Sequence, residues 1–590
     1  MSCIKKKEET TTALVPTTKS SRGQQDDAAK LGVGATNILD RLAASVGCLQ
    51  EAQPVFSPAL DVPCGGVLLA LPALLACGLL LEVQRYFQLP KGYYGLQSIF
   101  ILLAFMALAR IKTVEDFRYC ASGEWGKVLG LDRAPEVRTL RTKIKHLSCN
   151  GQVKEWGAEL CKQWIQTDTE APAVFYIDGH VRVYYGSQTK LPKHYVAREK
   201  LCLRATTDYW VNAMDGQPFF YVNKAVDPGL LQVLENDIIP KLEQEIPRQD
   251  DPHKHRFTIV FDREGYSPDF MKRMKDKDIA CITYHKHPKD EWPVEEFVDC
   301  QVPSQVTGNV INCKLAERGT CLPNRLWVRE IRKLGNNGHQ TSILSTDFNS
   351  DLRIVAVEMG SRWTQENFFK YMRHNYNLDR LIEYSLDPIP DPTKVVNPAY
   401  RSLDKQVRNN KAKQRRLFSE FGKIQLHDEI EPAEVEKYQT KKADLQEEIQ
   451  NLQIEVVKLK QQRKKVPRHI TISELPEAEK FDALSSASKY LLDTIKMVAY
   501  RAETAMVNII RKTMSRPDDG RKLLKAIYST EADILPDEKN GTLTVNLHHL
   551  ANHCSDAIIS ELCDELNNTS TVFPGTKLRL IFSMGSKQNP

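Results

Sequence analysis

The sequence has no Cys-x-x-Cys pair, although it contains 14 cysteines. Scattered cysteines of this kind are typical of reduced thiols in a cytosol rather than of a disulfide framework. Cys300, Cys313 and Cys321 lie loosely together downstream of His285 and His287. Their irregular spacing favours structural cysteines over a zinc site.

Long hydrophobic runs are also lacking. The longest covers residues 67–81 and is interrupted by Pro72 and Gly78, whereas a helix needs about 18–20 apolar residues to cross a bilayer. We therefore expect buried helices of a helical domain and no membrane span. The first residues are rich in Lys, Glu, Thr and Ser and contain no hydrophobic signal segment, which predicts that the chain is not exported.

The chain carries little net charge, +6 over 590 residues. An apolar content of 42% and a charged content of 26% are ordinary for a soluble globular protein. Whole-chain charge is thus weak support for a nucleic-acid partner, and local basic clusters must carry that argument. The length predicts several domains with ample chain for a large core.

Three acidic residues lie in local sequences that suit metal-binding carboxylates. Asp178 follows an apolar run and precedes Gly179, His180 and a second strand-like run, a pattern that predicts strand, tight turn and strand, with His180 pointing into solvent. Asp262 ends another apolar run, and Glu366 lies where apolar residues recur at helical spacing. Alone, each aspartate is more often a turn or helix cap. Together, the three acids indicate a Mg²⁺ site for phosphodiester chemistry.

This pattern resembles the DDE transposases of bacterial insertion sequences, from about residue 60 to the C-terminus. It is most similar to the branch with the signature Tyr-x2-Arg-x3-Glu-x6-Lys. Arg362 and Glu366 keep the Arg-x3-Glu spacing, and Arg373 stands at the Lys position.

The sequence departs from the signature at its tyrosine, where it has Met359. In the family this tyrosine helps to hold DNA near the cleavage site, so that role is absent here or has passed to Trp363 or Tyr371. The resembling branch also carries a β-rich insertion before the glutamate. Strand-like runs at 325–329 and 352–357 match it.

The resemblance implies a mixed α/β fold, with a ribonuclease-H-like catalytic core, the β-rich insertion, a helical N-terminal domain and a helical-hairpin or coiled-coil arm. The expected segments are a disordered or weakly structured tail (1–58), a helical candidate DNA-binding domain (59–168), the first part of the core (169–300), the insertion (301–357), the Glu-bearing helix (358–398), the basic arm (399–468) and a C-terminal α/β region (469–590).

The resemblance also implies a reaction. Asp178, Asp262 and Glu366 would be catalytic and would bind two Mg²⁺ ions, with Mn²⁺ as a substitute, Asp178 bridging both ions. The site would nick DNA at the terminal repeats of the element and join the free 3′ end to target DNA. Arg362 and Arg373 would neutralise flanking phosphates.

Two basic regions are candidates for binding this DNA. A short helix at 124–131, a turn and a basic helix at 136–147 have the outline of a helix-turn-helix unit, with Arg138, Arg141 and Lys145 as candidate contacts. An ordinary basic, solvated helix face explains the same residues equally well.

The second basic region lies between residues 401 and 423, where eight Lys or Arg residues occur. A heptad repeat follows it and predicts a coiled-coil seam, formed by Tyr438, Leu445, Leu452 and Leu459. Two helices joined near Pro432 would pair within the chain or between two chains. The candidate DNA contacts in this arm are Lys411, Lys413, Arg415 and Arg416.

The predicted function is therefore DNA transposition, by a homodimer in the synaptic complex, in a cytoplasmic, nucleoid-associated protein without a membrane partner. Two alternatives remain open from the sequence. One is a catalytically inactive, transposase-derived DNA-binding regulator, and the other is a metal-dependent nuclease of the same fold.

Overall fold

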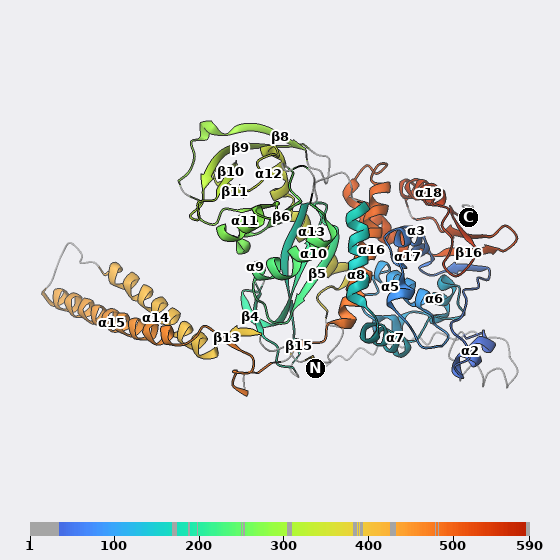
Figure 1. The fold of residues 1–590 in the computed structure, drawn as a ribbon, viewed down its shortest axis with the longest axis horizontal. Coiled ribbons are helices and arrows are strands. Elements are labelled where there is room, and N and C mark those ends of the chain that lie inside the picture. Colours follow the sequence, from blue (N-terminus) through green and yellow to red (C-terminus); the bar gives the residue numbers. More distant parts are fainter. Residues whose placement is uncertain are drawn as a thin grey trace, which may run out of the picture.

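The computed structural model describes residues 35–585 with short gaps. It shows an elongated mixed α/β chain, with a helical part at one end, a large sheet in the middle and a two-helix arm at the other end (Figure 1). The gaps are residues 168–173, 187–188, 197–198, 249–250, 252–253, 289, 304–309, 381–385, 388, 390–392, 425–431, 478–479, 482 and 551.

The N-terminal part is helical, as its Leu- and Ala-rich sequence predicts. The run at 67–81 contributes to the short helices η1 (Gly65–Ala70) and α3 (Leu71–Ala76), and α5 (Leu96–Leu108) is buried on almost all sides. Within the described ranges, no helix is both long and apolar enough to cross a membrane. The other helices here are α2 (Ile38–Ser45), α4 (Val83–Tyr86), η2 (Asp116–Tyr119), α6 (Ser122–Leu129), α7 (Val137–Asn150) and α8 (Val153–Thr167).

Residues 35–58 are more ordered than the weakly structured tail that the sequence predicts. Helix α2 is attached by Arg41, which forms an ion pair with the buried Asp132. The guanidinium of Arg41 also lies 3.9 Å from the ring centre of Tyr93. Local composition cannot reveal such a contact, because Asp132 is distant in sequence. Residues 1–34 lie outside the described residues.

A ten-stranded mixed sheet forms the middle of the chain. Its strands are β2 (Val174–Val183), β3 (Lys193–Val196), β4 (Leu201–Asn212), β5 (Pro218–Lys224), β6 (Phe257–Phe261), β7 (Ile279–Tyr284), β8 (Val298–Pro303), β9 (Val310–Cys321), β10 (Trp327–Leu334) and β11 (Gln340–Ser345). Their order is β3-β4-β2-β6-β7-β11-β10-β9-β8, and β5 also pairs with β4. The β2–β6 and β6–β7 pairs are parallel, and the other pairs are antiparallel.

The sequence signals in this sheet are partly confirmed. Asp215 and Gly216 stand between two strand-like runs, which predicts a hairpin. This hairpin joins β4 to β5, and Gly216 has the positive φ, +87°, that such a turn requires. The predicted turn after Asp178 is wrong, because β2 continues through Gly179 and His180. These residues pair with the long strand β4, whose ladder outweighs the local preference of Gly for a turn.

The insertion continues the sheet instead of forming a separate unit. Strands β8 to β11 form an antiparallel meander, and β11 pairs with β7. Residues 352–357, expected as a strand, belong to helix α12 (Leu352–Gly360). The side chain of Asp351 caps this helix by accepting the Arg353 N–H at 2.7 Å. Val355 and Met359, four residues apart, are buried on one helix face.

Helices cover the two faces of the sheet. Residues 230–245 form one continuous helix, in which a π-helical turn precedes Pro240. The helix predicted around Glu366 is confirmed as α13 (Arg362–Tyr376). The remaining elements of this region are α9 (Leu230–Val233), η3 (Leu234–Ile238), α10 (Ile239–Glu245), η4 (Arg263–Gly265), α11 (Pro268–Lys275) and η5 (Val294–Glu296).

The arm is an antiparallel helical hairpin of α14 (Pro398–Lys423) and α15 (Pro432–Lys465), which project together from the body (Figure 1). Leu417 packs on Ile449 and Leu452 of the heptad region. Arg463 pairs with Asp404 near the base of the arm. The predicted seam therefore pairs helices of the same chain. Two short strand pairs lie at its base, β12 (Leu386–Asp387) with β15 (Ala483–Leu484) and β13 (Lys394–Val396) with β14 (His469–Thr471).

The C-terminal region shares its structure with the N-terminal part. Helix α16 (Ala487–Ile510) is buried nearly all round because it packs on α3, α5, α7 and α8 as well as on the C-terminal helices. A four-stranded sheet of order β1-β16-β17-β18 includes a strand from each end of the chain. The elements are β1 (Ala59–Val62), η7 (Pro517–Asp519), α17 (Gly520–Ser529), β16 (Ala532–Asp537), β17 (Thr542–Leu547), α18 (His553–Asn568) and β18 (Arg579–Met584).

One buried carboxylate connects these parts. Glu503 of α16 is fully buried and accepts hydrogen bonds from Tyr371 at 3.0 Å and Tyr376 at 2.9 Å, both on α13. It also pairs with Arg110, just after α5, and with Arg521 of α17 at 3.0 Å. The N-terminal helices, the Glu366 helix and the C-terminal unit thus meet at a single side chain.

We expect Glu503→Gln to lower the free energy of unfolding by about 3–5 kcal/mol, because two arginines would lose their buried anionic partner. Tyr371→Phe removes one hydrogen bond to a charged group and should cost about 1.5–3 kcal/mol. Urea unfolding followed by far-UV circular dichroism measures both. The exposed Glu538→Gln is the matched control. A Glu503→Gln protein as stable as this control would contradict the assignment.

Candidate active site

Asp178 and Asp262 lie side by side on neighbouring parallel strands. In the β2–β6 pair Ile177 is opposite Phe261, so the two aspartates come next at the same level. Adjacent strands are about 5 Å apart. Asp178 accepts the Gly179 N–H at 2.8 Å, and Asp262 follows β6, where it caps η4 by accepting the Arg263 N–H at 2.7 Å. Strand pairing therefore brings together two carboxylates that are far apart in sequence.

Glu366 reaches the same place because the residue before it attaches α13 to the sheet. The buried Gln365 amide donates hydrogen bonds to the carbonyl oxygens of Tyr176 and Trp210, each at 3.2 Å, and to Asn212 Oδ1 at 2.8 Å. Tyr176 precedes Asp178 by two positions on β2. The first turn of α13 is thus fixed against the strand that carries Asp178, and Glu366 lies one residue further along.

Arg362 lies among the three acids. Its guanidinium pairs with Glu366 at 2.9 Å, and its side chain is only 11% exposed. Burial lowers the pKa of Arg362, but the charges of Asp262, Glu366 and Asp178 outweigh this and raise it above its usual value. Burial raises the pKa of Asp178 to about 6, against the effect of Arg362, with a further increase from Asp262 and Glu366. The four side chains therefore form one electrostatic cluster.

The three carboxylates at Arg362 do not form a single close set of ligand atoms. In the described part of the chain, only Asp61, Asp533 and His548 bring three ligand atoms within 4.8 Å of one another, so the three acids at Arg362 are more widely spread. Ions of a two-metal site lie about 3.5–4 Å apart, and their outer ligands are farther apart still. Three carboxylates with no sulfur ligand form an oxygen donor set that fits Mg²⁺.

Met359 and the two possible replacements for the signature tyrosine, Trp363 and Tyr371, differ in how exposed they are and in their partners. Met359, at the tyrosine position, is fully buried, so it cannot touch DNA. Tyr371 donates its hydroxyl to Glu503, which removes it as a replacement. Trp363 is 59% exposed beside Arg362 and remains the candidate.

Further along α13, Arg373 is exposed but pairs with Asp379 at 2.8 Å. His180, expected to point into solvent, is instead buried, bonds to Asp379 and stacks on Phe369 with ring centres 4.9 Å apart. The prediction for His180 was wrong because it rested on a turn that the strand β2 replaces. Arg373 and His180 share Asp379 as a partner, which links α13 to β2.

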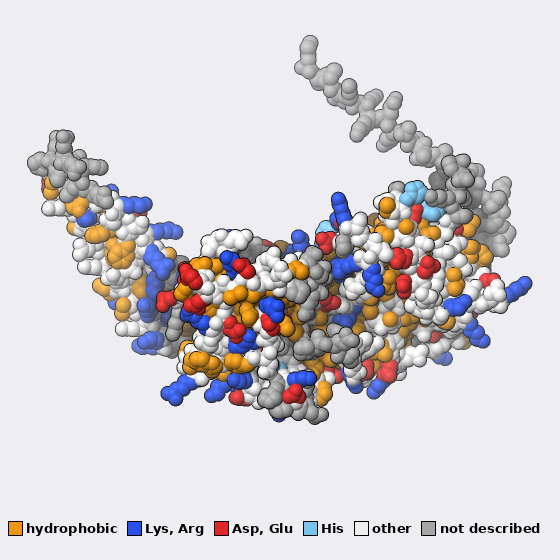
Figure 2. Space-filling model, turned by 90° about the horizontal axis from the view of Figure 1, so that it is seen from above, with side chains coloured by type: hydrophobic (Ala, Val, Ile, Leu, Met, Phe, Trp, Pro, Cys, Tyr) orange, Lys and Arg blue, Asp and Glu red, His pale blue; other side chains and the backbone are white. Residues whose placement is uncertain are grey.

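The predicted basic contacts are on the surface. Arg138, Arg141 and Lys145 are exposed on α7, although Arg141 pairs with Glu115. Lys and Arg side chains follow the arm in the space-filling view (Figure 2). The four arm residues named above, 411, 413, 415 and 416, are exposed on α14, and Lys413 pairs with Glu448 at 2.7 Å. Their placement permits contact with DNA.

The sequence did not reveal the residues that position the site, Gln365 and Asn212. Gln365 is a polar residue on the apolar face of an otherwise amphipathic helix, which is the one signal that points to it. Asn212 is the last residue of β4 and is fully buried. Buried amides of this kind must be hydrogen-bonded, and here they bond each other.

Comparison with known proteins identifies the family of the chain. A protein-family model described as "Transposase protein" matches residues 32–586. None of the curated proteins matches the chain. The match includes the helical N-terminal part, the sheet with its acids, the arm and the C-terminal unit. Because it covers nearly the whole sequence, the chain belongs to the transposase family, a family of DNA-processing enzymes.

Proposed function

We propose that the chain is a DDE transposase, which cleaves DNA at the ends of its element and joins the freed 3′ end to target DNA. The observation that carries the proposal is the convergence of Asp178, Asp262 and Glu366 around Arg362. The mixed sheet order, with two aspartates on adjacent parallel strands, supports the ribonuclease-H-like core that the resemblance implies.

The three carboxylates are assigned as ligands of two Mg²⁺ ions. Such ions supply the chemistry of phosphoryl transfer, by activating the attacking oxygen and stabilising the leaving oxygen. Asp178, Asp262 and Glu366 would hold these ions, and the charge of Asp178 interacts with those of the other two carboxylates. Arg362 offsets the charge of the acids. With cations on the acids, its guanidinium would be available to pair with a phosphate of the DNA.

The proposal includes a homodimer in the synaptic complex, since an element has two ends to be cleaved and joined. The arm offers an apolar surface outside its own seam. Phe418, Ile454 and Val457 are each about half exposed there, at 50%, 55% and 53%. Exposed apolar side chains on a projecting arm suit contact with a second subunit. The origin in a bacterial insertion sequence and the association with the nucleoid are likewise proposals.

Asp178→Asn, Asp262→Asn and Glu366→Gln should each reduce cleavage and joining by at least a thousandfold, because each removes a charged ligand from a shared pair of ions. Combining two of them should add little further loss. The substrate is a plasmid that carries the DNA flanking the gene on both sides. Asp276→Asn, an exposed aspartate at the end of α11, is the matched control. Cleavage without joining would instead identify a nuclease, and normal turnover by a triad variant would remove that residue from the site.

Activity should require Mg²⁺ or Mn²⁺ and should be lost in EDTA. Ca²⁺ should permit DNA binding with little cleavage, because its looser coordination positions the reacting oxygens poorly. Binding is measured by electrophoretic mobility shift and cleavage on the same samples. Full activity in EDTA would contradict the two-metal assignment, whereas it would leave the family membership untouched.

Neutralising Lys411, Lys413, Arg415 and Arg416 with glutamine should weaken DNA binding equally for all sequences. At roughly 0.9 units of log–log salt slope per phosphate contact, the slope should become shallower by about 2–4 units. A salt series of affinities measures it. The control replaces the same number of exposed lysines on the C-terminal unit, namely Lys522, Lys525, Lys539 and Lys577. An unchanged slope would make the arm a structural or dimer-forming element.

A further inference from the structure

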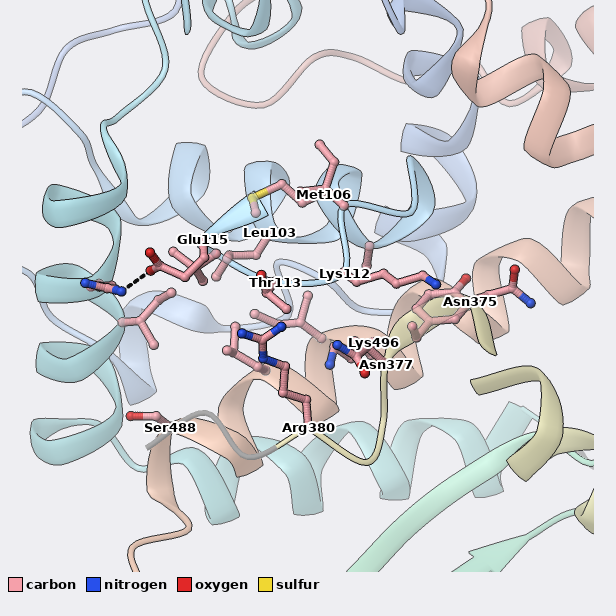
Figure 3. Close-up of a pocket in the computed structure, with 18 of the residues that line it drawn as sticks. Leu103, Met106, Lys112, Thr113, Glu115, Asn375, Asn377, Arg380, Ser488 and Lys496 are labelled. Carbon is pink, nitrogen blue, oxygen red and sulfur yellow. Dashed lines mark ion pairs between the residues drawn. The ribbon is translucent and has the colours of Figure 1, made fainter. Parts of the chain in front are cut away.

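A cavity separate from the three acids lies where the N-terminal helices, the end of α13 and α16 meet (Figure 3). Its volume is about 310 Å³, which is at the lower end of the range for small-ligand pockets. Asn377, just past the end of α13, is one of its lining residues. Eleven residues separate it from Glu366 along the chain, or about 16 Å at 1.5 Å per helical residue.

The lining combines an apolar floor with a cationic rim. Leu103 and Met106 of α5 and Leu492 of α16 are part of the floor. Five of the lining side chains are cationic and only Glu115 is anionic, and Glu115 is already paired with Arg141. The cations are Lys112, Arg141, Lys145, Arg380 and Lys496.

The excess of positive charge extends into the protein interior at Lys496, where it is energetically unfavourable. Its side chain is 13% exposed, and its ammonium lies 3.6 Å from Asp493 Oδ1, beyond hydrogen-bond distance. Lys489 already holds the other oxygen of Asp493 at 2.5 Å. Behind them, Arg182 is matched by Asp208. Lys489 and Lys496 thus share Asp493, with which Lys496 forms an ion pair, and the three cations face only two carboxylates. A net positive charge in such a largely buried cluster is unfavourable. An anion bound in the cavity would balance this positive charge.

The side of the cavity next to Lys496 also offers hydrogen-bonding groups. Figure 3 shows Asn377, Thr113 and Arg380 close to Lys496, with Leu103 and Met106 above them in this view. A ligand that fits this arrangement has a flat body with apolar faces and a polar edge, joined to an anionic group. A nucleobase linked to a phosphate has this chemistry, and phosphate is the anion that Lys and Arg bind in nucleic acids.

We propose that this cavity binds one nucleoside phosphate, with its phosphate on Lys496 and Arg380 and its base on the apolar floor. The ligand is either a free nucleotide or the terminal nucleotide of a DNA strand. The second source fits the geometry, because Arg141 and Lys145, candidate DNA contacts on α7, line the same cavity. The binding does not depend on the metal-binding acids, so it is testable whether or not cleavage is observed.

Calorimetric titration of the full chain with dAMP, deoxyadenosine and inorganic phosphate tests the proposal. dAMP should bind at least tenfold more tightly than deoxyadenosine or phosphate alone, because only dAMP fills both parts of the cavity. Lys496→Met and Arg380→Gln should each weaken dAMP binding at least tenfold. Lys522→Met, an exposed lysine on α17, should leave it unchanged.

Two further readouts keep the test decisive. Lys496→Met removes a buried charge and should unfold at the same or a higher temperature without ligand, while it loses the stabilisation that dAMP gives the unsubstituted chain. If that variant fails to fold, Arg380→Gln, at the exposed rim, decides the question. Equal affinity for dAMP and phosphate, or dAMP binding that survives Arg380→Gln, would overturn the proposal.

Competition identifies the source of the ligand. A 5′-phosphorylated single-stranded oligonucleotide that displaces dAMP indicates a strand end, and a lack of displacement indicates a free nucleotide. The same oligonucleotide without its phosphate is the control. Both results support a nucleoside-phosphate site and differ only in which molecule uses it.

Discussion

The buried carboxylate of Glu503 is the constraint on which the arrangement of this protein depends. It lies on α16, the helix that both terminal regions enclose, and it receives Arg110, Arg521, Tyr371 and Tyr376. Arg110 also donates a hydrogen bond to the hydroxyl of Tyr371 at 2.7 Å, so two of these partners bond each other as well as Glu503. A buried charge with two cations and two hydroxyls is satisfied only in one geometry. The position of α13 relative to both ends of the chain follows from that requirement.

Helix α13 is consequently held at both ends. Near its start, Gln365 donates hydrogen bonds to carbonyl oxygens of β2 and β4. Towards its end, Tyr371 and Tyr376 donate hydrogen bonds to Glu503. Glu366 follows directly after the first anchor, so its carboxylate has little freedom relative to Asp178. A site whose ligands are fixed by packing and hydrogen bonds needs little reorganisation when it is used. The polar contacts at both ends of α13 therefore fix the position of Glu366 in the candidate site.

A feature of the fold or of the candidate site could be predicted from the sequence where its signal lies within a few neighbouring residues. The three acids, the Glu366 helix, the hairpin at Gly216 and the two arm helices each have a signal within a few residues, and the structure contains each of them. The strand β2 through Gly179 and the helix at 352–357 were predicted wrongly, because pairing with β4 and the Asp351 cap override the local propensities. Gln365 and Glu503 were not recognised, since a buried polar residue has meaning only through partners that the fold brings to it.

Arg362 combines a local sequence signal with partners that only the fold brings together. On an exposed helix, an Arg and a Glu four apart contribute only about 0.3–0.5 kcal/mol. Here the strand register has already placed Asp178 and Asp262 beside Glu366, and three carboxylates so close repel one another. The nearly buried guanidinium of Arg362 offsets that repulsion, so the fold tolerates a concentration of negative charge without a bound cation. The same concentration of negative charge would attract a divalent ion under the proposed function. The spacing of the Arg and Glu on one helix face therefore serves the stability of the fold as well as the proposed chemistry.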